Sequence, residues 1–493
     1  MKKLTAMLCI IVLVFAFSSI ALAANTRTSG LYTYEIKGNG TLTITKYNWD
    51  RNDGDVFIPS MLDGYTVTSI GEKAFSREVF DKKGACTVRL PDTIVQIGEF
   101  AFQNSPITFI HIPKSVQMIG DGAFANCQNM LKFSVDENNH TFATIDNVLF
   151  HKQKKQLIAY PYANYNNGKY EIPEGIKSIA PYAFYWEHVK NGNLDLERSS
   201  HYAIYDISAL KWPTTLIEIG DYAFYGCMVE TIPLVDRIGN YSFSHGATWS
   251  MIKKDDIGNY ASGKVAQIPY METKEIGIGA FEQFNSAGTV QLVINATDVS
   301  SYAFSAIKNS IKLKNIENIG EGGFMSCVSI YGTFPATIKS IGPYAFADTY
   351  IDIETIEIPS AVNEIGDYAF SLNYDNPSSP VKYYNRERNE NLQTVIIQDG
   401  CTRVGNGAFE GHPQLSTVIF PDTITEIGEN AFADCKKLSE VRLPASISKI
   451  GNNAFEKEYI TLIVEPYSYA ELWASENGYT IQGKTENTDW LNN

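Results

Sequence analysis

Apolar residues recur along most of the chain in a short frame, apolar-x-x-apolar-x-apolar, which is typical of a β-strand with one buried face. In Leu438-x-x-Val441-x-Leu443 the intervening places hold the polar residues Glu440 and Arg442. Successive side chains of a strand point to opposite faces, so Val441 and Leu443 are expected to face inward. The same frame starts at Leu415, Leu392, Ile353, Ile107 and Met130. A proline follows many of the frames and cannot donate to a sheet ladder, so each strand is predicted to end there.

A second phrase, Ile-Gly-x-x-Ala-Phe, alternates with this frame. It recurs, with small changes, at Ile70, Ile97, Ile119, Ile179, Ile219, Ile238, Ile257, Ile276, Val299, Ile319, Ile341, Ile365, Val404, Ile427 and Ile450. Several intervals are 19 or 23 residues, and a period of about 20–25 residues kept up this long indicates a solenoid. We expect the glycine to form a corner with positive φ. The next residue, often Asp, Asn or Ser, should cap a single helical turn that carries Ala and Phe inward.

These patterns predict a β-rich repeat solenoid, a stack of about fifteen rungs, with a cap at each end. We assign residues 24–67 to an N-terminal β cap, 68–457 to the solenoid and 458–493 to a C-terminal cap and tail. Insertions interrupt the period at 133–161, 185–212 and 371–391. Ser468 and Gly478 bracket a predicted cap helix that precedes a last strand.

Two stretches, AFADCKKLSEVRLPASISKIGNNAF (431–455) and VFIPSMLDGYTVTSIGEKAF (56–75), resemble the BspA-like subclass of bacterial leucine-rich repeats. The irregular stretch FSVDENNHTFATIDNVLFHKQKKQLIAYP (133–161) resembles the hairpin-bearing unit of the same family. The resemblance covers roughly 30–484 and implies a right-handed leucine-rich-repeat solenoid, export or attachment to the cell surface, and binding of host extracellular proteins or other cells. It carries no catalytic residues over to this chain.

The first 23 residues have the features of a secretory signal peptide. Lys2 and Lys3 precede an apolar run over 4–20, and Ala21-Leu22-Ala23 provides an A-x-A cleavage site, so cleavage is predicted after Ala23. The alternative is a membrane anchor, for which the run is short. No later apolar stretch approaches the roughly 20 residues that a span needs. The processed chain is therefore expected to be secreted or held at the cell surface.

The net charge of the chain excludes some classes of partner, and the positions of its cysteines argue against disulfides. Removal of the two lysines takes the formal charge from −15 to −17, which argues against nucleic acid and anionic membranes as partners. Four cysteines each lie three residues after a repeat Phe: Cys127, Cys227, Cys327 and Cys435. These cysteines lie on rungs that are not neighbours. Because neighbouring rungs are about 4.8 Å apart, the Cα atoms of two such cysteines are too far apart for a disulfide. We therefore predict buried thiols that act as small hydrophobes. Cys86 and Cys401 lie outside that register, and no disulfide is predicted for them.

Catalytic and metal-binding motifs are not evident in the sequence. The seven histidines are scattered and form no zinc spacing. Residues 136–139 and 50–55 loosely resemble a calcium loop but have neither its spacing nor its closing glutamate. Carboxylates fall mostly at capping and outward positions of the repeat. We therefore expect no metal, no cofactor and no enzyme activity, with an enzyme that uses a carboxylate pair as the remaining alternative.

Three surface features are candidates for binding, each with an ordinary structural alternative. Outward positions of the frame carry Phe109, His111, Ile396 and Ile419, which could bind protein or merely favour β structure. The two later insertions carry residues typical of interfaces, Trp186, Tyr383, Tyr384, Arg386 and Arg388. Tyrosines in one register form a possible ladder that could bind glycans or simply stack between rungs: Tyr182, Tyr222, Tyr241, Tyr260, Tyr302, Tyr344 and Tyr368.

The resulting hypothesis is an exported, non-enzymatic binding scaffold for a protein ligand, such as a host matrix or cell-surface protein. The alternative is a glycan-binding or envelope-associated module that uses the tyrosine ladder.

Overall fold

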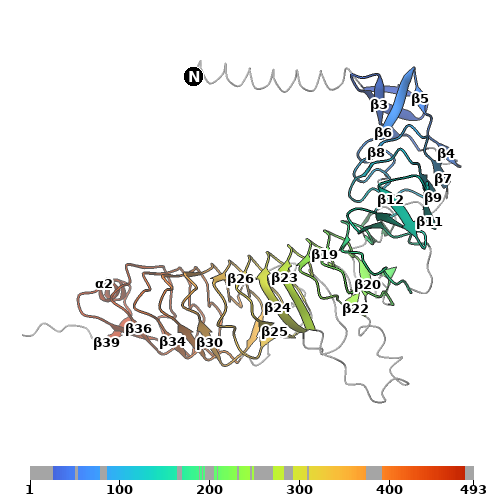
Figure 1. Cartoon of the computed structure of the whole chain (residues 1–493). Helices are drawn as coiled ribbons and strands as arrows, with labels where there is room; N and C mark the ends of the chain where they lie inside the picture. The colour runs from blue at the N-terminus through green and yellow to red at the C-terminus, as the bar shows by residue number, and fades with distance from the viewer. Residues whose placement is uncertain are drawn as a thin grey trace, which may run out of the picture. The chain divides into compact units, whose positions relative to one another are not determined.

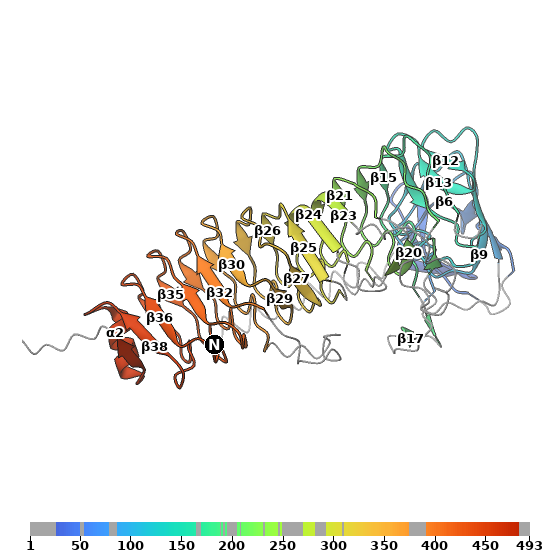
Figure 2. The same ribbon diagram turned by 90° about the horizontal axis from the view of Figure 1, so that it is seen from below.

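A computed structural model describes residues 26–49, 54–77, 86–163, 169–187, 189–190, 193–194, 205–207, 209–229, 232–244, 247–248, 270–281, 292–307, 310–373 and 391–482. The chain divides into two compact units, Met1–Asn167 with Pro173–Ala203 (unit 1) and Gly168–Ile172 with Ile204–Asn493 (unit 2). Within each unit short strands stack rung on rung (Figures 1 and 2). The described chain is a β-solenoid of about 16 turns, mostly strands, with one C-terminal helix. The solenoid prediction is thereby confirmed.

Unit 1 begins with an antiparallel cap and continues as parallel rungs. One of its sheets contains β1 (Thr26–Ser29), β2 (Tyr32–Ile36), β3 (Thr41–Tyr47), β5 (Met61–Leu62), β6 (Tyr65–Ile70), β8 (Gln96–Ile97) and β10 (Met118–Ile119). β1, β2 and β3 pair antiparallel, and β3, β6, β8 and β10 then pair parallel in that order, with β10 at the end. The predicted N-terminal β cap is confirmed by this meander.

A second sheet of unit 1 holds the frame strands β4 (Val56–Phe57), β7 (Cys86–Arg89), β9 (Ile107–Ile112) and β11 (Lys132–Val135), in the order β11-β9-β7-β4. After β11 come the hairpin strands β12 (Phe142–Ile145), β13 (Val148–His151) and β14 (Gln156–Ala159), then β15 (Ser178–Ile179) and the pair β16 (Val189–Lys190) and β17 (Asn193–Leu194). β12, β13 and β14 pair antiparallel, and β14 pairs parallel with β15. The irregular stretch of the sequence is therefore a β-hairpin inserted into the stack.

Unit 2 carries the corner strands, each ending at the Ile or Val of the phrase: β19 (Glu218–Ile219), β21 (Arg237–Ile238), β23 (Tyr270–Ile276), β24 (Leu292–Val299), β26 (Asn318–Ile319), β28 (Ser340–Ile341), β31 (Glu364–Ile365), β33 (Arg403–Val404), β35 (Glu426–Ile427) and β37 (Lys449–Ile450). The frame strands are β18 (Tyr205–Asp206), β20 (Cys227–Val229), β22 (Ala247–Thr248), β25 (Ser310–Lys314), β27 (Ser329–Tyr331), β29 (Tyr350–Asp352), β30 (Thr355–Ile358), β32 (Thr394–Ile397), β34 (Thr417–Ile419), β36 (Glu440–Leu443), β38 (Thr461–Val464) and β39 (Thr480–Gln482). Successive corner strands pair parallel and in register, as in Val404 with Ile427 and Ile427 with Ile450.

Phenylalanine rings form the column that fills the core of unit 2. The rings of Phe243, Phe281 and Phe304 stack nearly parallel, with centroids 5.3 and 5.1 Å apart. The same stacking continues through Phe324, Phe346, Phe370, Phe409, Phe432 and Phe455. One ring per rung thus gives each interface between rungs the same apolar filler, as the phrase predicts.

Some of the buried cysteines donate hydrogen bonds to main-chain carbonyls as well as filling the core. All six described cysteines are buried thiols, and burial raises the pKa of Cys127 to about 12. The Sγ of Cys327 donates to the carbonyl of Phe304 in the preceding rung, 3.0 Å away. Thr349 takes the same place one rung later, and its hydroxyl donates to the Phe324 carbonyl at 2.6 Å. The prediction of buried thiols is confirmed, but their hydrogen bonds to main-chain carbonyls were not foreseen.

The prediction of positive φ at the corner glycine was wrong. Gly98 has no positive φ, but a Cβ built on it would lie 2.7 Å from the carbonyl carbon of Gly71 in the preceding rung. Glycine is therefore required by the close approach of two backbones. The left-handed conformation lies two residues later, at φ of 51° for Phe100 and 55° for Tyr222.

The expected capping residues also act differently from the prediction, because the corner is a turn rather than a helical turn. The Oδ1 atoms of Asp367 and Asn406 accept main-chain N–H groups of Asn406 and Glu429, each in the following rung, at 2.9 Å. Burial alone would raise the pKa of Asp367, but hydrogen bonds from Asn406 and Arg403 hold it below its ordinary value. These side chains tie neighbouring rungs together.

The C-terminal cap follows the prediction. Helix α2 (Tyr469–Glu476) begins after Ser468, whose side chain accepts the N–H of Glu471. Gly478 follows the helix with a φ of 69°, and β39 then pairs parallel with β38. The helix buries Trp473 and Ala474 and so closes the last rung.

Candidate functional site

The outward side of the sheet β4-β7-β9-β11 gathers aromatic and basic residues from four rungs. Strand register places Phe57 beside Arg89, Arg89 beside His111, and His111 beside Ser134. A parallel row holds Thr87, Phe109 and Lys132. We call the surface formed by Phe57, Thr87, Arg89, Phe109, His111, Lys132 and Ser134 the aromatic–basic face.

Two cations of this face lie over aromatic rings. The guanidinium of Arg89 is 5.1 Å from the centroid of Phe57, and Nζ of Lys132 is 5.2 Å from that of Phe109. Nδ1 of His111 is hydrogen-bonded to Oγ of Ser134 at 2.6 Å. Phe57 is 59 % exposed. These contacts hold the side chains in place on a rigid sheet, with apolar surface still accessible to a partner.

The structure therefore brings Phe109 and His111 together, as their shared frame suggested. Sequence reasoning missed Phe57, Arg89 and Lys132, which come from neighbouring frames. The sequence could have indicated them by their place in the repeat frame. Phe57 precedes Ile58 and Arg89 precedes Leu90, both at outward positions of their frames.

The other two outward candidates lie in unit 2. Ile396 on β32 is directly opposite Ile419 on β34, and Glu357 on β30 flanks Ile396. Ile419 is 51 % exposed. A row of Thr355, Thr394 and Thr417 runs beside them. This pair forms a small apolar spot without the cations that accompany Phe57 and Phe109.

Trp186 anchors the base of its insertion. Its ring is half-buried and lies 5.5 Å from the ring of Tyr162. The next residue, Glu187, accepts on its carbonyl from Nδ2 of Asn126 (3.3 Å) and Nε2 of Gln128 (3.0 Å). The candidates Tyr383, Tyr384, Arg386 and Arg388 lie outside the described residues.

Two pairs of tyrosines in the ladder register stack ring on ring. Tyr222 stacks on Tyr241 at 5.0 Å, and Tyr344 stacks on Tyr368 at 5.4 Å. Elsewhere in the register a glycine leaves room for the preceding ring: a Cβ on Gly279 would lie 2.3 Å from the ring of Tyr241. Gly322 and Gly407 stand in the same relation to Tyr302 and Tyr368. Tyr182 belongs to unit 1, and Tyr260 lies outside the described residues.

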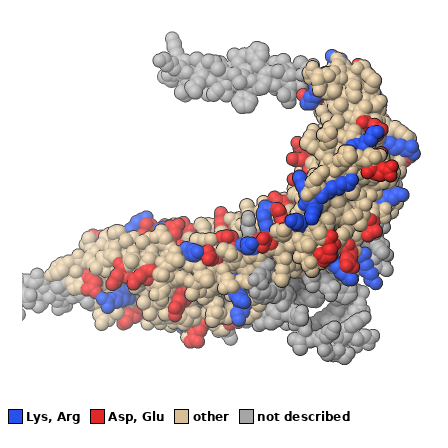
Figure 3. Space-filling model, in the orientation of Figure 1, with Lys and Arg blue, Asp and Glu red and all other residues tan. Residues whose placement is uncertain are grey.

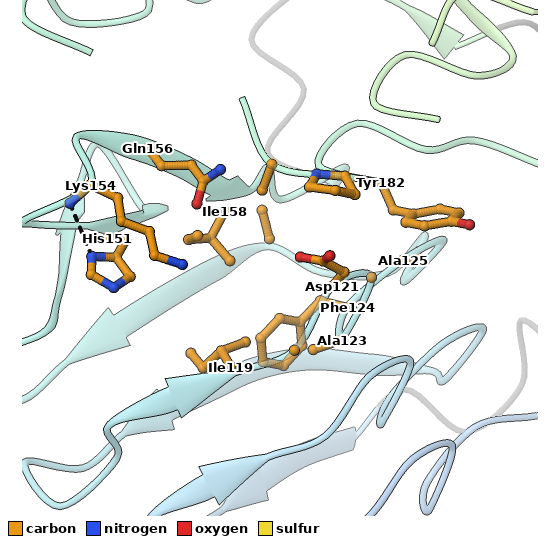
Figure 4. Close-up of a pocket in the computed structure, with 15 residues that line it drawn as sticks. Ile119, Asp121, Ala123, Phe124, Ala125, His151, Lys154, Gln156, Ile158 and Tyr182 are labelled. Atoms are coloured by element: carbon orange, nitrogen blue, oxygen red, sulfur yellow. Dashed lines mark hydrogen bonds between the residues drawn. The ribbon is translucent and has the colours of Figure 1, made fainter. Parts of the chain in front are cut away.

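A groove opens in unit 1 where the hairpin interrupts the stack (Figure 4). Ile119 and Phe124 line one side and Gln156 and Ile158 the other, with His151 and Lys154 at one end and Tyr182 at the opposite end. Its cavity volume is about 40 Å³, enough for about three waters. Nδ1 of His151 accepts the N–H of Lys154 at 3.3 Å. Burial and the charge of Lys154 lower the pKa of His151, so the imidazole is neutral at pH 7.

Within the described ranges, no three His, Cys, Asp or Glu side chains come together as a metal site. In the same residues, no helix has the length and apolar character needed to cross a bilayer.

Stacked strands, a glycine at most corners and a column of phenylalanine rings define a leucine-rich-repeat solenoid, a class typical of non-enzymatic scaffolds. The chain belongs to the family described as BspA type leucine-rich repeat region, whose repeats match in six copies over residues 60–161, 177–261, 256–375 and 383–472. Comparison with curated proteins gives no match.

Solved structures from three bacteria are similar to this chain along most of its length. A leucine-rich cell surface protein of Faecalibacterium prausnitzii is 19 % identical, with a TM-score of 0.34, covering 95 % of this chain and 96 % of that one. A leucine-rich repeat protein of Bacteroides ovatus is 19 % identical (TM-score 0.30, 93 % and 100 % covered). One from Eubacterium ventriosum is 18 % identical (TM-score 0.29, 87 % and 93 % covered).

Proposed function

We propose that this chain is an exported, non-enzymatic scaffold that binds a protein ligand through the aromatic–basic face. The observation that carries the proposal is the pairing of Arg89 with the exposed ring of Phe57 and of Lys132 with Phe109 on one rigid sheet. Aromatic residues and arginine are the side chains most enriched at the centres of protein interfaces. Because the strands already fix them, little conformational entropy is lost on binding.

The signal-like N-terminus over 1–23 supports export, and the proposed location is outside the cell or on its surface. A matrix protein or a protein on another cell is the partner class that this location and the family resemblance favour.

The test is binding of residues 24–493 to an immobilised panel of matrix proteins and glycans. The informative variant carries Phe57→Ala, Arg89→Glu and Lys132→Glu, and should bind its protein ligand at least about tenfold more weakly, the loss of one to two hot-spot contacts. A control variant, Ile419→Ala with Arg442→Glu, changes one exposed apolar and one basic side chain on the frame strands of unit 2 and should retain binding. Circular dichroism spectra should be the same for both.

A third variant tests the insertion candidates. Replacing 374–390 with a short Gly/Ser linker leaves Ser371, which is buried, and Asn373, which is hydrogen-bonded to Asp434, in place. Loss of binding in this variant alone would move the site to the insertion and contradict the aromatic–basic face. Binding to glycans alone, unchanged by all three variants, would favour the tyrosine register instead.

A further inference from the structure

Four exposed lysines of unit 1 come together where the inserted hairpin rejoins the stack. Lys152, Lys154 and Lys155 belong to the turn between β13 and β14, in which the N–H of Lys155 donates to the carbonyl of Lys152 at 3.3 Å. The N–H of Lys177, in the next rung, donates to the carbonyl of Lys155 at 2.8 Å. All four residues are exposed, and we call them the lysine patch.

Within the described part of the chain, no ion pair joins any lysine of this patch to an Asp or Glu side chain. Nζ of Lys152 donates to the main-chain carbonyl of Asn139. Asp121 and Lys154 both line the groove of Figure 4 without pairing. Figure 3 shows Lys and Arg side chains gathered on unit 1 of a chain whose formal charge is −15. The patch is therefore a local excess of positive charge on an acidic protein.

Elsewhere in the solenoid the positions that correspond to Lys155 and Lys177 carry opposite charges. In unit 2 the N–H of Lys274 donates to the carbonyl of Asp236 at 3.2 Å, and Nζ of Lys274 is 3.0 Å from Oδ2 of the same aspartate.

Glu317 and Lys339 repeat this arrangement, with the same main-chain bond at 2.6 Å and an ion pair of 2.6 Å. The fold thus pairs opposite charges well at these positions, whereas the lysine patch places two like charges there.

The lysine pair is an unfavourable choice for the stability of the rung. Like charges at adjacent positions of a sheet destabilise it. Lys155 also has a left-handed backbone, with a φ of 50°, which glycine and asparagine adopt more readily than lysine. Departures of this kind from the locally favoured residue are typical of functional surfaces.

The composition of the patch favours an anionic chain over a protein surface. The residues that accompany the lysines in the two segments are Gln153, Gln156 and Ser178, so these segments supply no aromatic or aliphatic anchor of the kind found at the centres of protein interfaces. The lysine ammonium is a compact point charge on a flexible stem. It therefore suits single anionic groups spaced along a chain.

A slender ligand is also compatible with the acidic character of the whole protein. At physiological salt, exposed charges more than about 8 Å apart are largely screened from each other, so a single chain responds mainly to the lysines that it touches. A DNA duplex or an anionic bilayer covers a wider area and would also meet the Asp and Glu side chains that Figure 3 shows on unit 1.

We propose that the lysine patch binds a sulfated polysaccharide chain. Sulfate groups pair with Lys155 and Lys177 on the two adjacent rungs, and the chain continues over Lys152 and Lys154. The bound sulfates balance the like charges that the fold leaves side by side. The patch shares no residue with the aromatic–basic face, so failure of either proposal leaves the other intact.

The test measures binding of fluorescently labelled heparin, a sulfated polysaccharide, to residues 24–493 by fluorescence anisotropy. Desulfated heparin, single-stranded DNA and polyglutamate are the comparison probes. Heparin should bind saturably and at least about tenfold more tightly than each of the others, and its affinity should fall as NaCl is raised from about 0.05 to about 0.3 M. Equal affinity for desulfated heparin or for DNA would overturn the assignment to sulfate groups. Tighter binding of polyglutamate would identify an acidic protein segment as the ligand instead.

The informative variant is Lys177→Glu, because it creates the opposite-charge pair that Glu317 and Lys339 form in unit 2. Heparin affinity should fall at least about tenfold, while the midpoint of urea unfolding should stay the same or rise. The control is Lys114→Gln with Lys436→Gln, which removes the same amount of charge from two exposed lysines elsewhere and should change the affinity less than about twofold.

Three results for these variants would overturn the proposal. Unchanged heparin affinity in Lys177→Glu would exclude the patch as the site. An equal loss in the control would show that only the net charge of the protein matters. A lower urea midpoint in Lys177→Glu would show that the lysine serves the stability of the rung.

Discussion

Replacing Gly98 with alanine is expected to destabilise unit 1 strongly, although its backbone conformation suits any residue. A Cβ at this position would lie 2.7 Å from the carbonyl carbon and 3.0 Å from the carbonyl oxygen of Gly71, and 2.8 Å from the nitrogen of Glu72. All three are main-chain atoms of the preceding rung, which cannot swing aside as a side chain can. The two rungs must therefore separate by about 0.7 Å to restore an ordinary contact.

The cost follows from what crosses this interface. The bonds from the N–H of Gly98 to Ile70 (2.8 Å) and from the N–H of Lys73 to Glu99 (3.0 Å) would lengthen beyond the usual range. Each is worth about 1 kcal/mol, and overpacking adds about 1–3 kcal/mol. Stiffening of the unfolded chain returns about 0.4–1 kcal/mol. We expect a net loss of about 2–4 kcal/mol in the free energy of unfolding.

Urea unfolding followed by circular dichroism measures this difference. Gly38→Ala is the matched control, because no atom lies within 4 Å of the built Cβ and the φ of Gly38 is not positive. It should change the free energy of unfolding by less than about 1 kcal/mol, in the stabilising direction. If Gly98→Ala proved as stable as Gly38→Ala, the close approach of the rungs would not be the reason for glycine at this corner.

Three further predictions concern the core, the surface and the response to pH. Cys327→Val should lower the free energy of unfolding by about 1–3 kcal/mol in urea titrations, because the buried carbonyl of Phe304 loses its donor; Cys327→Thr, nearly the same in shape but with a hydroxyl, should lose much less, and equal losses would contradict this role. Arg403 donates to Asp367 at 2.6 Å and its side chain is 27 % exposed, so Arg403→Met should cost about 1 kcal/mol or less at low salt, with the cost shrinking in 0.5 M NaCl; a salt-independent loss would point to packing instead. Burial and the charge of Lys154 lower the pKa of His151 from 6.5, so the folded state binds a proton at this site less readily than the unfolded state. The free energy of unfolding should therefore fall as the pH drops below 6.5, and level off once the folded imidazole is protonated. Urea titrations at several pH values should show that His151→Gln removes this part of the pH dependence.

The repeat made most of the fold predictable, because one phrase and one frame account for nearly every rung. The inward placement of Val441 and Leu443 and the helix that starts after Ser468 needed nothing beyond local pattern. The reason for the glycine did not follow from the pattern. A sequence shows that only the smallest residue is used at Gly98, but not which main-chain atoms of another rung lie beside it.

Predicting the candidate sites, unlike predicting the fold, required knowing which residues of neighbouring strands pair with each other. Phe109 and His111 could be predicted as outward residues of one frame, whereas Phe57 and Arg89 joined them only once the pairing of β4, β7 and β9 was known. The groove beside Ile119 could not be predicted either. The interval between Ile119 and Leu157 is long enough to indicate an insertion, but the empty space beside Ile119 depends on where the hairpin lies in three dimensions.

Because one phenylalanine ring stacks on the next from rung to rung of unit 2, the packing of the core does not depend on the number of rungs. Phe409 stacks on Phe432, and Phe432 on Phe455, at nearly equal spacings of 5.4 and 5.5 Å. Excision of one 23-residue repeat between Val404 and Ile427 would seat equivalent rings on each other again. Recombination can therefore lengthen or shorten the gene by whole repeats while every interface stays well packed. Evolution can in this way adjust the spacing between surfaces in steps of one rung, a freedom that a protein with a single closed core does not have.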